Sequence, residues 1–272
     1  MMLTDTHCHL THGDLSAQLD AVLERARRAA VTRIITVATT PADARRALAI
    51  ARAHPEVYVA AGVHPHEAGA AAPADLDALA DLHRGGWPEL AGLERRLVAI
   101  GETGLDLHYD FATPQRQEQV FRFQLALACE VSRPVIIHAR KSEPRVCDIL
   151  AEYPALRGRV VFHCFSGDAD LARRILDAGW WLSFTGVVTF KNAATICSAA
   201  KAAPSDRIMV ETDAPFLSPE PVRKLRPCEP AFVAHTARRL AELRGVEFED
   251  FAARTTANAE RFFRLRRPDE VF

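Results

Sequence analysis

The sequence has almost no excess of charge, no closely spaced pair of cysteines and no long apolar run. Its 34 basic and 35 acidic residues leave a net charge of -1, which argues against a broad basic face that coats duplex nucleic acid. No uncharged apolar run approaches the roughly 18 residues of a membrane span, so we expect no membrane contact. The six cysteines form no C-x-x-C pair and follow no leader-like segment. We therefore expect reduced thiols in a cytoplasmic protein without a signal peptide.

Short apolar runs alternate with longer amphipathic segments along the whole chain. The predicted strands are Leu3–Cys8, Arg33–Ala38, Val57–Val63, Leu97–Gly101, Pro134–His138, Arg159–His163, Gly179–Phe184 and Arg207–Glu211. The predicted helices are Leu15–Ala30, Pro41–Ala53, Pro73–His83, Pro114–Val131, Glu143–Tyr153, Asp168–Asp177, Ala193–Ala203, Ala231–Arg244 and Phe248–Leu265. Three of these helices begin with proline, which the first helical turn tolerates.

This alternation favours an α/β fold, a single (β/α)8 TIM barrel that forms one domain over residues 1–272. Such a barrel typically needs about 250 residues, and a hydrophobic content of 49% is ample for its core. A doubly wound open sheet is the alternative, but it predicts a glycine-rich phosphate loop after the first strand. His7-Cys8-His9 stands at that point instead. In a barrel, the active site lies at the carboxyl ends of the strands.

Histidines and carboxylates stand at the ends of six of the eight predicted strands. Side chains alternate along a strand, so His7 and His9 share one face, and we expect Cys8 to point into the core. By the same argument Glu211 and Asp213 point to one side, where two carboxylates need cations or a metal as partners. Core histidines scattered through a fold would not all fall at the same end of their strands.

The remaining polar residues at strand ends are single side chains, and each has a plain structural alternative. Glu102 ends its strand and could pair with Arg140, while His138 and His163 could be satisfied core residues. Arg140 would face the same pocket as His138 and is suited to grip a phosphate oxygen, or else to form a salt bridge with a loop acid. We expect Asp106 to shape the loop that follows.

The number of ligands favours a catalytic site with two divalent ions. One ion would take His7, His9, Glu102 and Asp213, and the second would take Glu102, His138 and His163. A carboxylate can use its two oxygens on two ions, which a single imidazole nitrogen cannot do. This assignment leaves positions for water and substrate. It predicts hydrolysis by a metal-activated hydroxide, with Asp213 and Glu102 as catalytic residues and Asp213 accepting the proton.

Six segments, in this order, resemble the TatD family of metal-dependent deoxyribonucleases, which are amidohydrolase-like TIM barrels. They are Asp-Thr-His-Cys-His-Leu (5–10), Gly-Val-His-Pro-His (62–66), Gly-Glu-Thr-Gly-Leu-Asp (101–106), His-Ala-Arg (138–140), His-Cys-Phe-Ser-Gly (163–167) and Glu-Thr-Asp-Ala-Pro (211–215). Residues 183–191 also resemble the family's strand-7 segment. The likeness spans residues 5 to about 230, and the motifs together are highly specific.

The resemblance implies divalent-metal-dependent hydrolysis of DNA, as a 3′-5′ exonuclease on single-stranded DNA or frayed 3′ ends. It carries the metal-ligand role to the same six residues, which are His7, His9, Glu102, His138, His163 and Asp213. It also implies substrate-binding or extra-metal contacts for His64 and Glu211. His66 and Ser166 are weaker candidates, with a supporting role as the alternative.

The ligands and the family favour different ions. Imidazole-rich sites favour zinc, manganese or iron, whereas magnesium prefers oxygen ligands. Family members are generally described as working with magnesium or manganese. We therefore expect two divalent ions per chain, with magnesium or manganese in use and zinc as a candidate for the bound species.

One segment departs from the family pattern, and one other activity is compatible with the ligands. The family usually has Arg-Gly-Lys and then Asn-Glu-Pro after strand 8, but here Cys228 stands where Asn would be, within the loop 218–230. The same ions would also serve an amidohydrolase that acts on an amide, lactone or aminoacyl ester. Those enzymes often carry a modified lysine where Glu102 stands, which favours the nuclease. A non-catalytic metal-binding or interaction module predicts gaps in the ligand set, and we expect no obligate protein partner.

Overall fold

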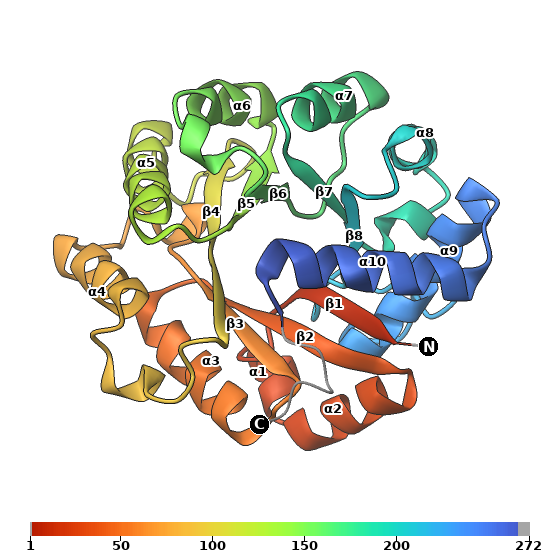
Figure 1. Ribbon diagram of the computed structural model, residues 1–272, viewed down its shortest axis with the longest axis horizontal. Helices are drawn as coiled ribbons and strands as arrows, with labels where there is room; N and C mark the ends of the chain where they lie inside the picture. Colours follow the sequence, from red (N-terminus) through yellow and green to blue (C-terminus); the bar gives the residue numbers. More distant parts are fainter. Residues whose placement is uncertain (1, 266–272) are drawn as a thin grey trace. The chain divides into compact units, whose positions relative to one another are not determined.

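The computed structural model describes residues 2–265, in which eight strands alternate with helices (Figure 1). The strands are β1 Leu3–Cys8, β2 Val31–Ala38, β3 Val57–Ala61, β4 Leu97–Asp106, β5 Val135–Arg140, β6 Val160–Phe162, β7 Trp181–Phe184 and β8 Ile208–Val210. They follow one another in the sheet in chain order, and the pairs β3–β4, β4–β5, β5–β6 and β7–β8 are parallel. Parallel strands in chain order, joined by helices, confirm the predicted (β/α)8 fold class.

Helices connect the strands and follow the last one. They are α1 Gly13–Ser16, α2 Leu19–Arg28, α3 Pro41–Ala53, α4 Pro73–Arg84, α5 Pro114–Val131, α6 Glu143–Ala151, α7 Ala169–Asp177, α8 Ala194–Ala202, α9 Val233–Arg244 and α10 Phe248–Phe263. Short 3-10 helices are η1 Pro65–Glu67, η2 Pro88–Leu90, η3 Pro154–Leu156, η4 Gly186–Thr189 and η5 Pro230–Phe232. None of the described helices is both long and apolar enough to cross a membrane.

Helix starts follow from the local sequence. The side chain of Thr40 accepts a hydrogen bond from the backbone N–H of Asp43, and Pro41 occupies the first turn of α3. Thr113 caps α5 in the same way by accepting from the N–H of Arg116. A cap of this kind contributes about 1 kcal/mol. Both helices have the predicted bounds.

The predicted helix 15–30 is wrong, because the chain forms two helices there. α1 ends at Ser16 and α2 begins at Leu19, since Gln18 has φ -137° and ψ 32°, outside the helical region. The last helix also ends at Phe263 rather than at Leu265.

The prediction that Glu102 ends its strand is also wrong, because β4 continues to Asp106. Gly101 and Gly104 have φ +135° and +142°, and a Cβ at Gly104 would collide with the carbonyl oxygen of His138. Only glycine permits this backbone and this close approach to β5. β4 stays paired with β5 as far as Asp106 opposite Arg140.

The chain divides into two compact units. The first unit comprises the described parts of residues 1–35, 164–177 and 181–272, and the second unit comprises 36–163 and 178–180. The prediction of one domain over residues 1–272 stays a prediction, and Met1 and residues 266–272 lie outside the described residues.

In the first unit, α10 packs along β1 and β8 (Figure 1). Phe251 and Phe262 on α10 are buried, and the side-chain amide of Asn258 donates to the carbonyl oxygens of Ser205 and Ile208. In the second unit, α5 packs on β4 and buries Phe121 and other residues of its inner face. Burial of one such large apolar side chain contributes about 1.5–3 kcal/mol. Each unit thus holds its strand ends on a packed support.

Candidate metal centre

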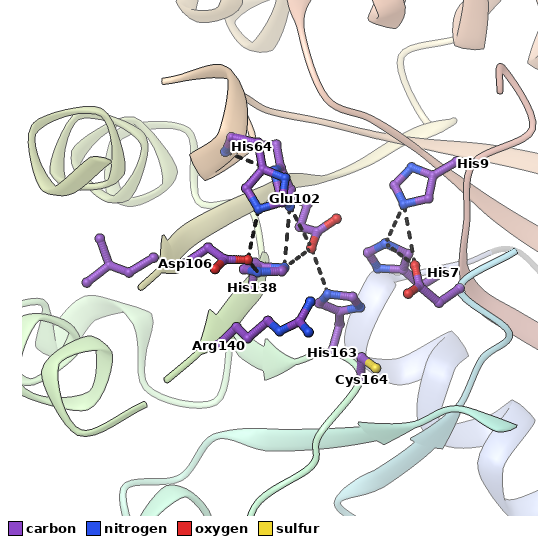
Figure 2. Close-up of polar contacts among 12 residues, drawn as sticks. His7, His9, His64, Glu102, Asp106, His138, Arg140, His163 and Cys164 are labelled. Carbon is purple, nitrogen blue, oxygen red and sulfur yellow. Dashed lines mark hydrogen bonds and ion pairs between the residues drawn. The ribbon is translucent and has the colours of Figure 1, made fainter. Parts of the chain in front are cut away.

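Four histidines and two carboxylates gather near the carboxyl ends of β3, β4, β5 and β6 in the second unit (Figure 2). We call them the second-unit cluster, which consists of His64, His66, Glu102, Asp106, His138 and His163. Glu102 and Asp106 lie on β4, His138 lies on β5, and His163 directly follows β6. The other two follow β3, His64 as the cap of η1 and His66 within it.

Glu102 lies at the centre of this cluster. Its Oε1 is 2.7 Å from Nδ1 of His138 and 2.7 Å from Nε2 of His163. Nε2 of His64 lies 3.4 Å from the same oxygen. Glu102, His138 and His163 each offer one ligand atom, all within 4.8 Å of one another. Two imidazole nitrogens and a carboxylate oxygen form a donor set that fits a borderline divalent ion.

Asp106 joins the histidines to the following loop through its two oxygens. Oδ1 accepts hydrogen bonds from the backbone N–H groups of His108 and Tyr109, at 2.9 and 3.1 Å, so the prediction that Asp106 shapes this loop is confirmed. Oδ2 lies 2.8 Å from Nε2 of His66 and 2.9 Å from Nε2 of His138. These histidine contacts were not predicted, because the predicted strand ends at Gly101, five residues before Asp106. Glu102 and Asp106 thus contact the two nitrogens of the same His138 ring and form a pair.

Hydrogen bonds set the charges of two members. Burial alone would raise the pKa of Asp106, but hydrogen bonds from His138 and His66 lower it below its usual value. Burial alone would lower the pKa of His138, but hydrogen bonds to Asp106 and Glu102 raise it overall. Contact with two carboxylates therefore favours the protonated ring in the absence of an ion.

His64 is a neutral member of the cluster. Burial lowers its pKa to about 4, although the nearby Glu102 opposes this shift. Nδ1 of His64 accepts a hydrogen bond from the backbone N–H of His66 at 3.1 Å, so Nε2 carries the proton of the neutral ring. His64 therefore directs an N–H group toward Glu102.

Two buried glutamines of α5 fix the backbone next to the cluster. Gln124 accepts from the N–H of Val63 at 2.9 Å and donates to the carbonyl oxygen of Val63 at 3.0 Å. Gln117 makes the same pair of bonds to the backbone of Asp106, at 2.8 and 3.0 Å. These glutamines were not predicted as supporting residues, because nothing in the local sequence of a helix indicates which distant backbone a glutamine will contact.

A second group, the first-unit cluster, consists of His7, His9 and Asp213. Nε2 of His7 lies 3.3 Å from Nε2 of His9, and a dashed line joins the two rings in Figure 2. Oδ1 of Asp213 lies 3.8 Å from Nε2 of His7 and 3.5 Å from Nε2 of His9. The three residues offer ligand atoms within 4.8 Å of one another, again a donor set that fits a divalent ion. The prediction that His7 and His9 share a face is confirmed, and Cys8 is fully buried as expected.

Backbone bonds fix the first-unit cluster. The N–H of Asp213 donates to the carbonyl oxygen of His7 at 2.8 Å, and the N–H of His9 donates to Ala214 at 2.7 Å. Asp213 has φ +56°, and β8 already ends at Val210. The alternation argument for Glu211 and Asp213 was therefore wrong in its reason, since neither residue lies in the strand.

Two further carboxylates support this end of the first unit. Glu211 accepts from the backbone N–H of Cys164 at 2.6 Å and from the hydroxyl of Thr6 at 3.3 Å. Asp5 accepts from both the N–H and the hydroxyl of Thr212, at 2.9 and 2.6 Å. Burial raises the pKa of Asp5 to about 8, even though these bonds oppose the shift. Asp5 was not assigned from the sequence, where only its place in the first motif pointed to it.

The remaining predicted residues lie near the surface or in the loop after β8. Arg140 is exposed, with its guanidinium 4.8 Å from the ring centroid of Tyr109, and Ser166 is exposed. Cys228 is buried, its N–H donates to the carbonyl oxygen of Pro215, and burial raises its pKa to about 12. In this loop the hydroxyl of Ser218 donates to the carbonyl oxygen of Leu225 at 2.7 Å.

A (β/α)8 fold with histidine–carboxylate clusters at the carboxyl ends of its strands defines the class of metal-dependent hydrolases. Residues 4–264 match the model of the TatD related DNase family. The chain therefore belongs to this family, and the resemblance seen in the motifs is confirmed.

Two relatives and one solved structure agree with this assignment. An uncharacterized metal-dependent hydrolase of Bacillus subtilis, YabD, is 40% identical over 97% of this chain and 100% of its own. The 3′-5′ ssDNA/RNA exonuclease TatD of Erwinia tasmaniensis is 34% identical over 96% of this chain and 99% of its own. The crystal structure of YJJV, a TatD homolog from Escherichia coli, superposes with a TM-score of 0.90 at 29% identity, covering 97% and 98% of the two chains.

Proposed function

We propose that this protein is a divalent-metal-dependent deoxyribonuclease that shortens single-stranded DNA or frayed ends from the 3′ terminus. The observation that carries the proposal is that the ligand atoms of His7, His9 and Asp213 lie within 4.8 Å of one another, as do those of Glu102, His138 and His163. Relatives named 3′-5′ ssDNA/RNA exonuclease, at 34% and 35% identity, support the choice of bond and substrate.

The proposal assigns two divalent ions to the chain. His7, His9 and Asp213 would hold one ion, and Glu102, His138 and His163 would hold the other. That Glu102 serves both ions stays a prediction from the sequence. We propose magnesium or manganese as the ions in use and zinc as a species bound on purification. When bound, such ions lower the pKa of water and offset the negative charge of the phosphate.

The side chains have separate tasks in this mechanism. Asp213, whose side chain is 15% exposed, would accept the proton of the attacking water. Glu102 lies 2.7 Å from Nδ1 of His138 and from Nε2 of His163, and it would act in catalysis by holding an ion together with these two rings. The exposed Arg140 would bind a phosphate oxygen.

His64 and Glu211 are proposed to contact the substrate or a further ion. Neutral His64 adds no charge beside Glu102. Glu211 is buried and accepts from the backbone N–H of Cys164, so a further ion suits its carboxylate better than a sugar hydroxyl. We also propose a cytoplasmic location, because all six cysteines are free thiols in the structure.

A time course on single-stranded DNA labelled at its 5′ end tests the proposal. With Mg²⁺ or Mn²⁺ the wild type should give a ladder of shortening products. EDTA and the Asp213→Asn substitution should abolish the ladder, whereas Glu249→Gln, which changes an exposed acid on α10, should leave it unchanged. A wild type that binds two ions by elemental analysis, leaves DNA intact and hydrolyses an amide or lactone panel would contradict the nuclease assignment.

A further inference from the structure

Two large aromatic side chains stand exposed on the loop after β4. Tyr109 is 42% exposed and Phe111 is 63% exposed. Their ring centroids lie 5.5 Å apart with the planes tilted by 45°. We call this pair the aromatic patch. Exposed aromatic surface is costly in water, and a cluster of it commonly marks a binding surface.

The loop that carries the aromatic patch is anchored at both ends. At its start, Oδ1 of Asp106 accepts the backbone N–H groups of His108 and Tyr109. At its end, the side-chain amide of Gln117 donates to the carbonyl oxygen of Ala112 at 2.9 Å. The same amide donates to the carbonyl oxygen of Asp106 at 3.0 Å, so one buried side chain fixes both ends. The patch is therefore a preformed surface, which loses little conformational entropy on binding.

The aromatic patch borders the second-unit cluster directly. The ring of His66 lies 4.6 Å from the ring of Phe111 and 5.5 Å from that of Tyr109, between centroids. Nε2 of His66 in turn lies 2.8 Å from Asp106, which also contacts His138. A ligand whose reacting end lies at the cluster would therefore have its adjoining part beside the patch.

A positive charge lies at the edge of the patch. The guanidinium of Arg140 is 4.8 Å from the ring centroid of Tyr109. Figure 2 shows the Arg140 side chain extending along the His138 side of the cluster. An aromatic face beside a cation matches the two parts of a nucleotide, a flat base and an anionic phosphate.

We propose that the aromatic patch stacks on bases of a single strand whose 3′-terminal phosphodiester lies at the second-unit cluster. This inference rests on the proposed nuclease function and adds a reason why the substrate would be single-stranded. Bases within a duplex are paired and stacked and do not offer their faces to the patch. Because every base has a π-face, the patch selects single strands with little preference for sequence.

The first test compares binding of intact and abasic DNA. Anisotropy of a 5′-labelled oligothymidylate is measured in EDTA, so that no cleavage occurs. The Tyr109→Ala/Phe111→Ala variant should raise Kd about tenfold, the loss expected for one stacked base. The same oligonucleotide with abasic sites next to its 3′ terminus should bind the wild type weakly. The double alanine variant should bind this abasic DNA with the same Kd as the wild type.

Two further variants separate stacking from folding. Tyr109→Phe/Phe111→Tyr keeps both rings and should bind like the wild type. Val246→Ala removes a different exposed apolar side chain, 47% exposed and between α9 and α10, and should also leave binding unchanged. In cleavage assays with Mn²⁺, the double alanine variant should raise KM about tenfold with kcat within about twofold, because it removes binding and not chemistry.

Several outcomes would overturn the inference. If the double alanine variant binds and cleaves DNA like the wild type, the stacking role is wrong and the nuclease function stands. Equal losses on intact and abasic DNA would show that the patch does not contact bases. A change from dimer to monomer on removing the rings would assign the patch to a second copy of the chain. A wild type that neither binds nor cleaves single strands would remove the proposed function together with the stacking role.

Discussion

The two histidine–carboxylate clusters are built differently. In the second-unit cluster, the carboxylate oxygens of Glu102 and Asp106 lie 2.7–2.9 Å from nitrogens of His66, His138 and His163, which are hydrogen-bond distances. In the first-unit cluster, the oxygen of Asp213 lies 3.5–3.8 Å from the histidine nitrogens, and backbone bonds fix its place. Similar donor sets are thus held by close side-chain contacts in one cluster and with the help of backbone hydrogen bonds in the other. Each cluster should therefore respond differently when a carboxylate is removed.

The largest effect is expected from Asp213→Asn. Asparagine tolerates the positive φ of this position, so the backbone should stay in place. Loss of the proposed base and ligand should lower kcat by at least about a thousandfold. The free energy of unfolding in EDTA should change by less than about 1 kcal/mol, because asparagine keeps the backbone hydrogen bond to the carbonyl oxygen of His7. Single-turnover cleavage and urea unfolding measure the two quantities, and a large loss of stability would refute the backbone-held description.

Glu102→Gln should lower both activity and stability. We expect kcat/KM to fall by about a hundredfold or more and bound metal to drop, because a proposed ligand is lost. Unlike Asp213→Asn, it should also cost about 1–3 kcal/mol in EDTA, since His138 and His163 lose their charged acceptor. Elemental analysis and urea unfolding check the two parts. An unchanged free energy of unfolding would mean that the contacts of Glu102 with His138 and His163 do not stabilise the fold.

Gln124→Met should have an intermediate effect through the support beneath the second-unit cluster. It leaves the backbone N–H and carbonyl oxygen of Val63 without their partner, which should cost about 2–3 kcal/mol. Displacement of the adjacent His64 should lower kcat/KM about tenfold. Gln119→Met, on the exposed face of the same helix, is the matched control. Equal effects of the two substitutions on stability and kinetics would contradict this role.

The smallest effect on activity is expected from His83→Gln, which changes a buried histidine outside both clusters. His83 on α4 is buried, with Nε2 3.0 Å from the carbonyl oxygen of Ala61, and burial lowers its pKa to about 3. The unfolded chain binds a proton at His83 below about pH 6.5, whereas the folded chain does not. Its contribution is therefore complete above pH 6.5 and declines by about 2 kcal/mol as the pH falls to 5. Urea unfolding in EDTA should show a shallower decline for His83→Gln, and parallel curves would contradict the prediction.

The local sequence predicted several helices and strands with their correct bounds. The bounds of β1, α3 and α5 agree with the prediction, because apolar periodicity and a threonine–proline start act over a few residues. β4 was missed beyond Gly101 because the apolar run ends there, whereas Gly101 and Gly104 permit close contact with β5.

Contacts between residues far apart in the chain could not be predicted from the sequence, and they complete the site. The contact of Asp5 with Thr212 and that of Gln117 with the Asp106 backbone depend on the fold, so the supporting residues escaped the sequence analysis. The motifs did point to the residues that gather in each cluster, and their ligand roles stay a prediction for the experiments above.

The anchoring of the loop by Asp106 also has a consequence for how related enzymes can diverge. Asp106 accepts hydrogen bonds from the backbone N–H groups of His108 and Tyr109, so this anchoring does not depend on their side chains. Replacing the rings would therefore keep the loop in register with the histidines. Under the proposed stacking role, the loop after β4 is a position where a few substitutions would change substrate preference without displacing the histidine–carboxylate cluster.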